Sequence, residues 1–200
     1  MIQLSDDSDK LIYIPSLKLN FIGERTLLGK NWYETYKELQ SNGKRMPTPL
    51  EFLEILKYVK ENNPNIYKEI TEVRNPWRAN WLDADFKVKG KDLYINYNHI
   101  LNSKGELIPN NSEFLDEDTL MKDNTLGISL EDYILNNHTS QGLPNKNVQP
   151  GELYYWFPRN DNDSTTWFSV DYTKPCLDCF RSPFTWGSGL GTFAVEDKLN

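Results

Sequence analysis

The sequence predicts an α+β fold, with two helices near the N-terminus followed by a twisted antiparallel sheet. Three observations lead to this class. Apolar side chains recur with helical spacing between residues 32 and 59, whereas from Trp81 onward they alternate with polar ones. Short aromatic-rich runs such as ELYYWFP and TWFSV then follow one another between turn-forming residues. Helices that come first and strands that come later are typical of α+β proteins.

The first expected helix lies in the run NWYETYKELQ. Trp32, Tyr36 and Leu39 stand at positions i, i+4 and i+7, so one face of this helix is apolar. Asn42 and Gly43 follow the run and are typical of a helix C-terminus. The spacing predicts a short amphipathic helix that packs one face on the core.

The second expected helix lies in TPLEFLEILKYVKENNP and carries clear start and stop signals. Thr48 suits the N-cap, Pro49 the first helical position, and Glu51 the third position of a capping box. The pair Asn63-Pro64 is expected to stop the helix. Its buried face is expected to consist of Phe52, Leu53, Leu56 and Val59.

The period of the apolar pattern changes to two in WLDADFKV and DLYINYNHI, with Gly90 in the turn between them. This alternation predicts a β-hairpin with one solvent-exposed face. Asp83 and Asp85 share a strand face and are interpreted as part of the exposed side. The two histidines, His99 and His138, are far apart in sequence, and we interpret both as solvated or capping residues.

Composition narrows the function classes. The chain has 200 residues, of which 38% are hydrophobic, which suffices for a sizeable core. Its formal net charge of −7 disfavours nucleic acid as a partner, because phosphate backbones require a cationic face. No apolar run approaches the length of about 20 residues needed to cross a bilayer. We therefore expect a soluble protein without membrane insertion, whose location is unknown and could include display on a virion or cell surface through a partner.

Several motifs carry a resemblance to a known family. The linker NGKRMPTPLEF has the spacing G-x-R-x-P-T-x-x-E, and the chain closes on GSGLGTFAV. Together with the long irregular middle, these motifs resemble the C-type lectin fold, in the branch shared by formylglycine-generating-enzyme-like domains and variable proteins of diversity-generating retroelements. The segments LYYWFPRNDNDS and LDCFRSPFTWGSGLGTFAV look more particularly like an archaeal variable protein of that kind. The motif residues in the linker are Gly43, Arg45, Pro47, Thr48 and Glu51.

The resemblance implies a domain organisation and a function. It implies a single domain over residues 1–200, with an insertion of hairpin and loops at about 81–150 and a variable, ligand-binding region at about 153–195. The function implied is non-enzymatic binding of a protein or glycan ligand through a hypervariable C-terminal surface on a rigid scaffold. Because the same fold hosts enzymes and binders alike, the motif alone does not decide between them.

The C-terminal strands alternate in a way that separates packing from display. In LDCFRSP, Leu177, Cys179 and Arg181 fall on one face of an extended segment, while Asp178, Phe180 and Ser182 fall on the other. In TWFSV, the same rule points Phe168 and Val170 inward and Trp167, Ser169 and Asp171 outward. The outward set mixes aromatic with small polar side chains, as binding surfaces of proteins do.

The resemblance implies which positions vary and contact ligand, and we expect them to be exposed and to lie on one side of the molecule. They are Trp167, Ser169, Asp171, Tyr172, Cys176, Asp178, Phe180, Ser182, Phe184 and Trp186.

Two other readings stay open. A formylglycine-generating-enzyme-like oxidase would hold copper with a cysteine pair, but Cys176 and Cys179 stand three apart in a strand-like stretch, which sends their sulfurs to opposite faces. We therefore expect no metal, no cofactor and no catalytic residue.

The run Asn160 to Asp163 could offer oxygens to Ca²⁺, but an Asn/Asp-rich turn needs no ion. A structural subunit of a virion or surface assembly is the third reading.

Overall fold

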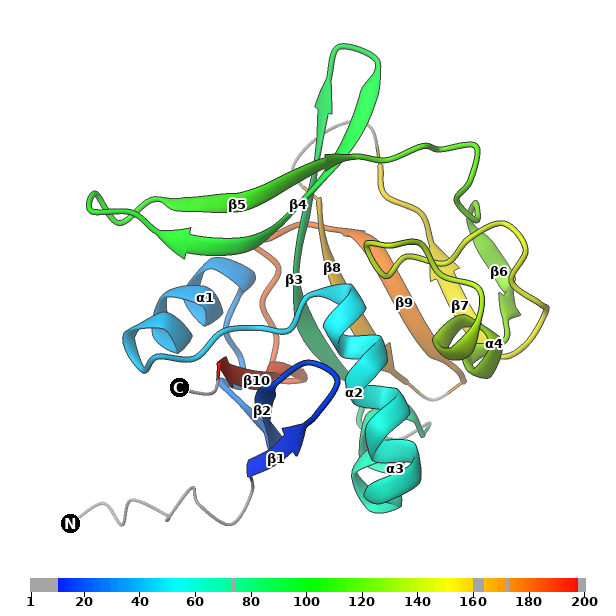
Figure 1. Ribbon diagram of the computed structural model, residues 1–200, viewed down its shortest axis with the longest axis horizontal. Coiled ribbons are helices and arrows are strands. Elements are labelled where there is room, and N and C mark those ends of the chain that lie inside the picture. The colour runs from blue at the N-terminus through cyan, green and yellow to red at the C-terminus, as the bar shows by residue number, and fades with distance from the viewer. Residues whose placement is uncertain (1–10, 73–74, 160–163, 172, 198–200) are drawn as a thin grey trace.

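The computed structural model describes residues 11–72, 75–159, 164–171 and 173–197. In this part of the chain, ten strands and four helices surround two apolar cores (Figure 1). In chain order the elements are β1 (Leu11–Ile14), β2 (Leu19–Thr26), α1 (Trp32–Ser41), α2 (Pro49–Asn62), α3 (Pro64–Thr71), β3 (Arg78–Lys89), β4 (Asp92–Leu101), β5 (Leu107–Phe114), β6 (Asn124–Ile128), α4 (Leu130–Leu135), β7 (Leu153–Trp156), β8 (Ser164–Val170), β9 (Pro175–Arg181) and β10 (Leu190–Asp197).

The strands form one mixed sheet in the order β1-β2-β10-β3-β8-β9-β7-β6. Strand β4 pairs with β3 and carries β5, so these two strands extend as a long hairpin from the sheet (Figure 1). Most neighbours are antiparallel, but β10 with β3 and β7 with β9 are parallel. The predicted hairpin at Gly90, whose φ is +70°, is confirmed as β3–β4.

The predicted α+β class, with two early helices and a twisted antiparallel sheet of the C-type lectin kind, is wrong. The described residues are mostly β, and the sheet is a mixed one of ten strands. Local alternation cannot reveal parallel pairs, because their partners are far apart in sequence. Strands β1 and β2 were missed, as was α3, which follows α2 directly at Pro64.

The two helices expected from capping signals are confirmed. Helix α2 begins after Thr48, whose hydroxyl accepts the Glu51 N–H at 3.2 Å while the Glu51 carboxylate accepts the Thr48 N–H at 2.9 Å. Helix α1 begins after Asn31, which makes the corresponding capping box with Glu34. Such boxes satisfy backbone donors that a helix leaves unpaired at its N-terminus.

The sheet has an apolar core on each face. Helices α2, α3 and α4 cover one face, where Phe52 of α2 contacts Phe168 of β8 with ring centroids 5.3 Å apart. Helix α1 covers the other face beside β10 and β3, through a smaller cluster that includes Trp32, Trp81 and Trp167. Buried side chains of a strand therefore alternate between two different cores.

Residues 81–150, predicted to be an insertion of a hairpin and loops, include most of β3, together with β4, β5, β6 and α4. Residues 81–89 belong to the central strand β3. Further along, Gly142 has φ +82°, and a Cβ there would lie 2.3 Å from the Leu50 backbone nitrogen. The nearby Tyr133 hydroxyl donates to the Gly142 carbonyl at 2.6 Å. This segment therefore packs tightly on the start of α2.

The linker motif has a structural explanation. The Arg45 N–H and carbonyl both pair with Val195 of β10. The Arg45 guanidinium binds the Glu51 carboxylate with two bonds of 2.7 Å and the Asp197 carboxylate with one of 3.1 Å. Pro47 accepts the Asp83 N–H at 2.8 Å. The motif thus joins α2, β3 and the C-terminal strand.

Candidate functional site

Strands β8, β9 and β7 are neighbours in the sheet. One of their two faces packs against the core on the α2 side, and the other face points away from α2. In the observed register, Tyr154, Cys176 and Ser169 are paired across the three strands, and so are Trp156, Asp178 and Trp167. Residues paired in this way point to the same side of a sheet. With Phe180 of β9, these seven residues are called the C-terminal face below: Tyr154, Trp156, Trp167, Ser169, Cys176, Asp178 and Phe180.

The predicted alternation along β8 and β9 is confirmed for the residues that pack inward. Phe168, Val170, Leu177 and Cys179 are all buried in the core on the α2 side. Arg181 is the exception, because it was expected on this inward side. Its side chain instead contacts members of the C-terminal face.

The expected exposure is wrong for Trp167 and Asp178. Trp167 is 6% exposed, because its ring lies 5.2 Å from Trp81 and 5.9 Å from Trp77 while the Arg181 guanidinium lies 4.7 Å above it. Asp178 is 0% exposed and accepts hydrogen bonds from Arg181 Nε and from the Phe180 N–H. Burial raises the pKa of Asp178, and these bonds only partly oppose that effect. Both side chains therefore form the floor of the face.

The remaining predicted positions differ in exposure. Ser169, Asp171, Cys176 and Phe180 are half-buried, and Ser182 is exposed. Burial opposes ionisation of Asp171, but hydrogen bonds from Thr173 and Lys174 outweigh it and lower the pKa of this carboxyl. Tyr172 and the possible calcium-binding run from 160 to 163 lie outside the described residues.

Phe184 and Trp186 are exposed, with 65% and 79% of their surface accessible. They lie in the loop between β9 and β10, which is held against α1 because the Trp32 N–H donates to the Pro183 carbonyl at 3.1 Å. The Phe184 ring also lies 5.2 Å from Tyr33. A firmly attached loop that exposes two large rings is typical of a recognition surface.

Two arginines beside the C-terminal face were not predicted from the sequence. The guanidinium of Arg159 lies 4.0 Å from the Phe180 ring centroid, and that of Arg181 lies 4.9 Å from the same centroid. The Trp156 ring also contacts Phe180, with the two ring centroids 5.6 Å apart and the rings nearly perpendicular. No local pattern identifies such a cluster, since Arg159 follows β7 and reaches a ring that is 21 positions away in the chain.

The two cysteines lie on opposite faces of β9, as predicted. Cys179 is in the core on the α2 side, whereas Cys176 on the C-terminal face interacts with Ser169. Burial is the main reason that the pKa of Cys176 rises to about 12, with Asp178 adding to it. The pKa of Cys179 is raised by burial as well. This geometry does not offer two neighbouring thiolates to one soft metal ion.

A buried histidine lies between two carboxylates at the base of the β4–β5 hairpin. His99 Nδ1 is 2.6 Å from Asp83 Oδ1, and Nε2 is 3.2 Å from Asp85 Oδ1. Burial alone would lower the pKa of His99, but hydrogen bonds and charges of both aspartates outweigh it and raise the pKa to about 9. The solvated interpretation of His99 and of Asp83 is therefore wrong, because α1 covers them with Trp32 and Tyr36.

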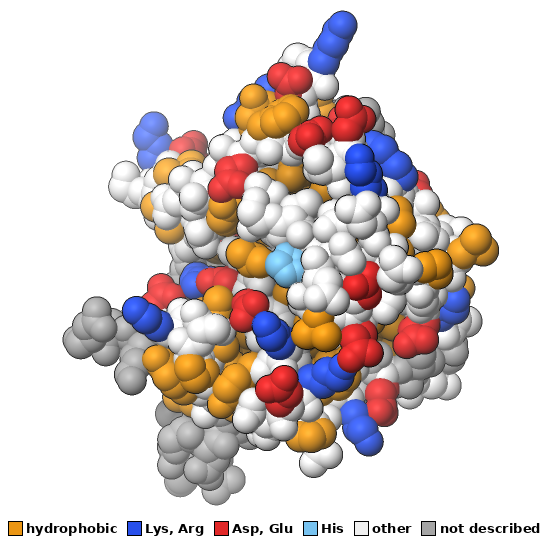
Figure 2. Space-filling model, turned by 45° about the vertical axis from the view of Figure 1, so that its right-hand side comes forward, with side chains coloured by type: hydrophobic (Ala, Val, Ile, Leu, Met, Phe, Trp, Pro, Cys, Tyr) orange, Lys and Arg blue, Asp and Glu red, His pale blue; other side chains and the backbone are white. Residues whose placement is uncertain are grey.

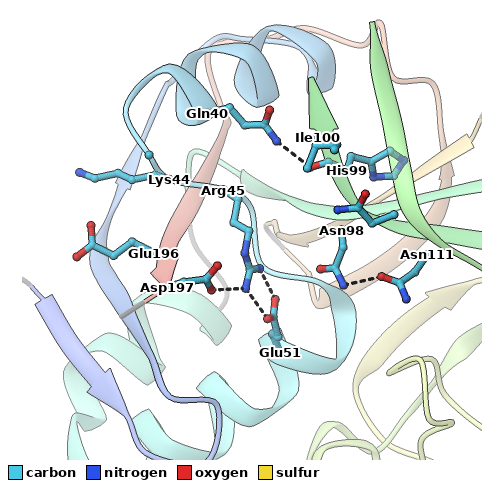
Figure 3. A pocket seen from close by; sticks show the side chains of 12 residues that line it. Gln40, Lys44, Arg45, Glu51, Asn98, His99, Ile100, Asn111, Glu196 and Asp197 are labelled. Atoms are coloured by element: carbon cyan, nitrogen blue, oxygen red, sulfur yellow. Dashed lines mark hydrogen bonds and ion pairs between the residues drawn. The ribbon is translucent and has the colours of Figure 1, made fainter. Parts of the chain in front are cut away.

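A cavity of about 550 Å³ adjoins this cluster (Figure 3). Arg45, Glu51 and Asp197 line one wall, and Asn98 and Asn111 are hydrogen-bonded to each other on the opposite wall. At its rim the Gln40 amide donates to the His99 carbonyl at 2.7 Å and accepts the Leu101 N–H at 2.7 Å. The charged side chains of the first wall are thus already paired with one another. Gln40 attaches the β4–β5 hairpin to α1.

Acidic and basic side chains are interspersed on the face shown in Figure 2, without a broad patch of one sign. In the part of the chain that the structure describes, no helix has the length and apolar character of a membrane span. No family model, no curated protein and no solved structure matches the chain.

Proposed function

We propose that the protein is a non-enzymatic ligand-binding protein and that its C-terminal face, together with the β9–β10 loop, contacts the ligand. The ligand is a protein or a glycan. One observation carries this proposal: residues 167–170 of β8 and 176–180 of β9 alternate between a packed core and the C-terminal face. Apart from the buried Trp167 and Asp178, side chains on such a face can change while the residues that hold the fold stay the same.

The chemistry of the surface suits recognition. Phe180, Phe184 and Trp186 offer large rings with few rotatable bonds, so ordering them on binding costs little entropy. Ser169 and Ser182 offer small hydroxyls that adapt to different partners. Buried Trp167 and Asp178 support these groups from below. The combination of rigid rings with adaptable polar groups favours binding over catalysis.

The resemblance to variable proteins of diversity-generating retroelements adds a proposal about how the surface changes. In that reading, substitutions between related chains concentrate on the half-buried and exposed positions of the C-terminal region. Sequencing relatives from one population, together with a search for a near-copy of this coding segment nearby, tests it. Substitutions spread evenly over both faces of β8 and β9 would contradict diversification.

Binding itself is tested by panning a random peptide display library and probing a glycan array. The wild type is compared with a triple variant, Phe180→Ala, Phe184→Ala and Trp186→Ala. A control variant removes exposed apolar groups elsewhere, at Leu11, Ile108 and Leu135. We expect wild type and control to select the same ligands and the triple variant to lose them. If the triple variant, still folded by circular dichroism, selects those ligands equally well, this surface is not the binding site.

A further inference from the structure

The Phe180 ring holds two positive charges close together. Arg159 and Arg181 both lie within cation–π distance of this one ring, at 4.0 and 4.9 Å. Like charges repel, so their proximity needs compensation. Asp178 supplies it for Arg181, whose Nε donates to that carboxylate. Arg159 lies near enough to Asp178 to lower the pKa of that carboxyl, but the described residues supply no carboxylate within ion-pair distance of its guanidinium.

The geometry of the two guanidinium groups leaves donors available. Arg181 uses Nε for Asp178, and no other hydrogen bond of its guanidinium is found among the described residues. Arg159 is exposed and rests on the Phe180 ring. A guanidinium that rests on a ring still presents its N–H groups in a planar fork, which matches a carboxylate with two parallel bonds. Both guanidinium groups therefore lie at the same ring with N–H groups available to a ligand.

The surroundings indicate what kind of anion fits. Lys174, 4.8 Å from the Tyr154 ring at the other end of the C-terminal face, adds a further positive charge. The chain as a whole has a net charge of −7, which disfavours a polyanion such as nucleic acid. Arginines that stand among tryptophan and phenylalanine rings are typical of the energetically important centres of protein–protein interfaces.

We propose that the pair formed by Arg159 and Arg181 receives the carboxylate of an aspartate or glutamate side chain from a peptide segment of a partner protein. This inference rests on the proposed function and specifies its ligand class. Asp178 forms its direct ion pair with Arg181, and the partner carboxylate supplies a direct pair for Arg159. Phe180 acts as the platform that aligns both guanidinium groups.

Two substitutions with opposite expected effects test the proposal. Arg159→Gln removes one fork from an exposed position, and Asp178→Asn removes the carboxylate that competes for Arg181. Lys146→Gln, which removes an exposed charge in the segment before β7, is the matched control. Circular dichroism and thermal unfolding confirm the fold of each variant.

The probes are peptides from a random display library panned on the wild type, then synthesised with a fluorescent label for anisotropy titrations. We expect the selected peptides to be enriched in Asp and Glu. Their Kd should rise about tenfold in Arg159→Gln, fall severalfold in Asp178→Asn and stay within about twofold in Lys146→Gln. Replacing the peptide's acidic residue with its amide should cost the wild type the same factor and cost Arg159→Gln much less.

The outcomes separate this inference from the proposed function. Peptides that need Phe180 but carry no acidic residue would overturn the inference and leave the proposed function standing. The same holds if Arg159→Gln and Lys146→Gln weaken binding equally, because the effect would then be general charge attraction. If no selected peptide and no arrayed glycan depends on Phe180, Phe184 or Trp186, both proposals are overturned.

Discussion

Arg181 and Asp178 form an ion pair in which the two partners are unequally buried. The Asp178 side chain is 0% exposed, whereas that of Arg181 is 39% exposed. Loss of the acid leaves a cation that water can reach, but loss of the cation leaves a carboxylate that water cannot reach. The pair is therefore asymmetric in what each substitution should do to stability.

Arg181→Met should destabilise the protein at pH 7 more than Asp178→Asn does. Breaking a buried pair costs about 3–5 kcal/mol, and the partial exposure of Arg181 places this case near the lower end. The loss should shrink toward pH 5, because the isolated Asp178 carboxyl can then take up a proton. Urea unfolding at both pH values measures this. Equal losses for the two variants would show that burial of Asp178 does not control the pair.

His99 should make stability depend on pH. Its pKa is about 9 in the folded protein and about 6.5 when unfolded, so folding favours the protonated form. This contribution is fully present below pH 6.5 and is lost as the pH rises through 9. The loss amounts to about 3 kcal/mol by linkage.

Chemical unfolding of the wild type and of His99→Gln between pH 6 and 9.5 tests this expectation. The free energy of unfolding should fall with pH in the wild type and be flatter in the variant. The His99 ring resonances should titrate near pH 9. A midpoint near 6.5 would mean that Asp83 and Asp85 do not hold the charged imidazole.

Thr48→Ala should lower the free energy of unfolding by about 1 kcal/mol, because the hydroxyl accepts a hydrogen bond from Glu51 at the start of α2. Ser103→Ala in the exposed turn between β4 and β5 is the control and should stay within about 0.5 kcal/mol. Urea melts measure both. If the unfolding curves of Thr48→Ala and the wild type coincide, the Thr48 hydroxyl does not stabilise the N-terminus of α2.

Replacement of each cysteine by serine should affect stability differently. Cys176→Ser should leave the free energy of unfolding within about 1 kcal/mol, because this half-buried group sits beside Ser169. Cys179→Ser should cost more, about 1–3 kcal/mol, because it places a hydroxyl in an apolar core. Elemental analysis should find no stoichiometric copper or zinc. One metal per chain that disappears in Cys176→Ser would favour the oxidase reading instead.

Local signals in the sequence predicted local structure. The capping residues Thr48 and Glu51 located α2, and alternation assigned Phe168 and Leu177 to the core. These features depend on residues only a few positions apart. The predicted exposure was wrong where strands distant in the sequence meet. Trp167 is covered by Trp81 of β3, and no pattern inside β8 can show this contact.

The same limit applies to charged groups. Asp83 and His99 sit on neighbouring strands of a correctly predicted hairpin, but their burial depends on α1, which packs on them from outside that hairpin. The fold class failed for a related reason, since the parallel pairing of β10 with β3 joins segments more than 100 residues apart. Contacts between segments far apart in the sequence therefore determine which side chains are buried and how the strands pair, and local alternation cannot predict these contacts.

We propose that the half-buried side chains of the C-terminal face serve recognition, whereas the inward side chains of β8 and β9 hold the fold, and two matched variants test this directly. One changes Ser169, Cys176 and Phe180 to alanine on the C-terminal face, and the other changes Phe168, Leu177 and Cys179 to alanine on the inward side. The measurement is the free energy of unfolding together with binding of a panned ligand. The first variant should keep its free energy of unfolding within about 1 kcal/mol of the wild type and lose binding, while the second should lose several kcal/mol of stability. Equal destabilisation of the two variants, or unchanged binding in the first, would contradict it.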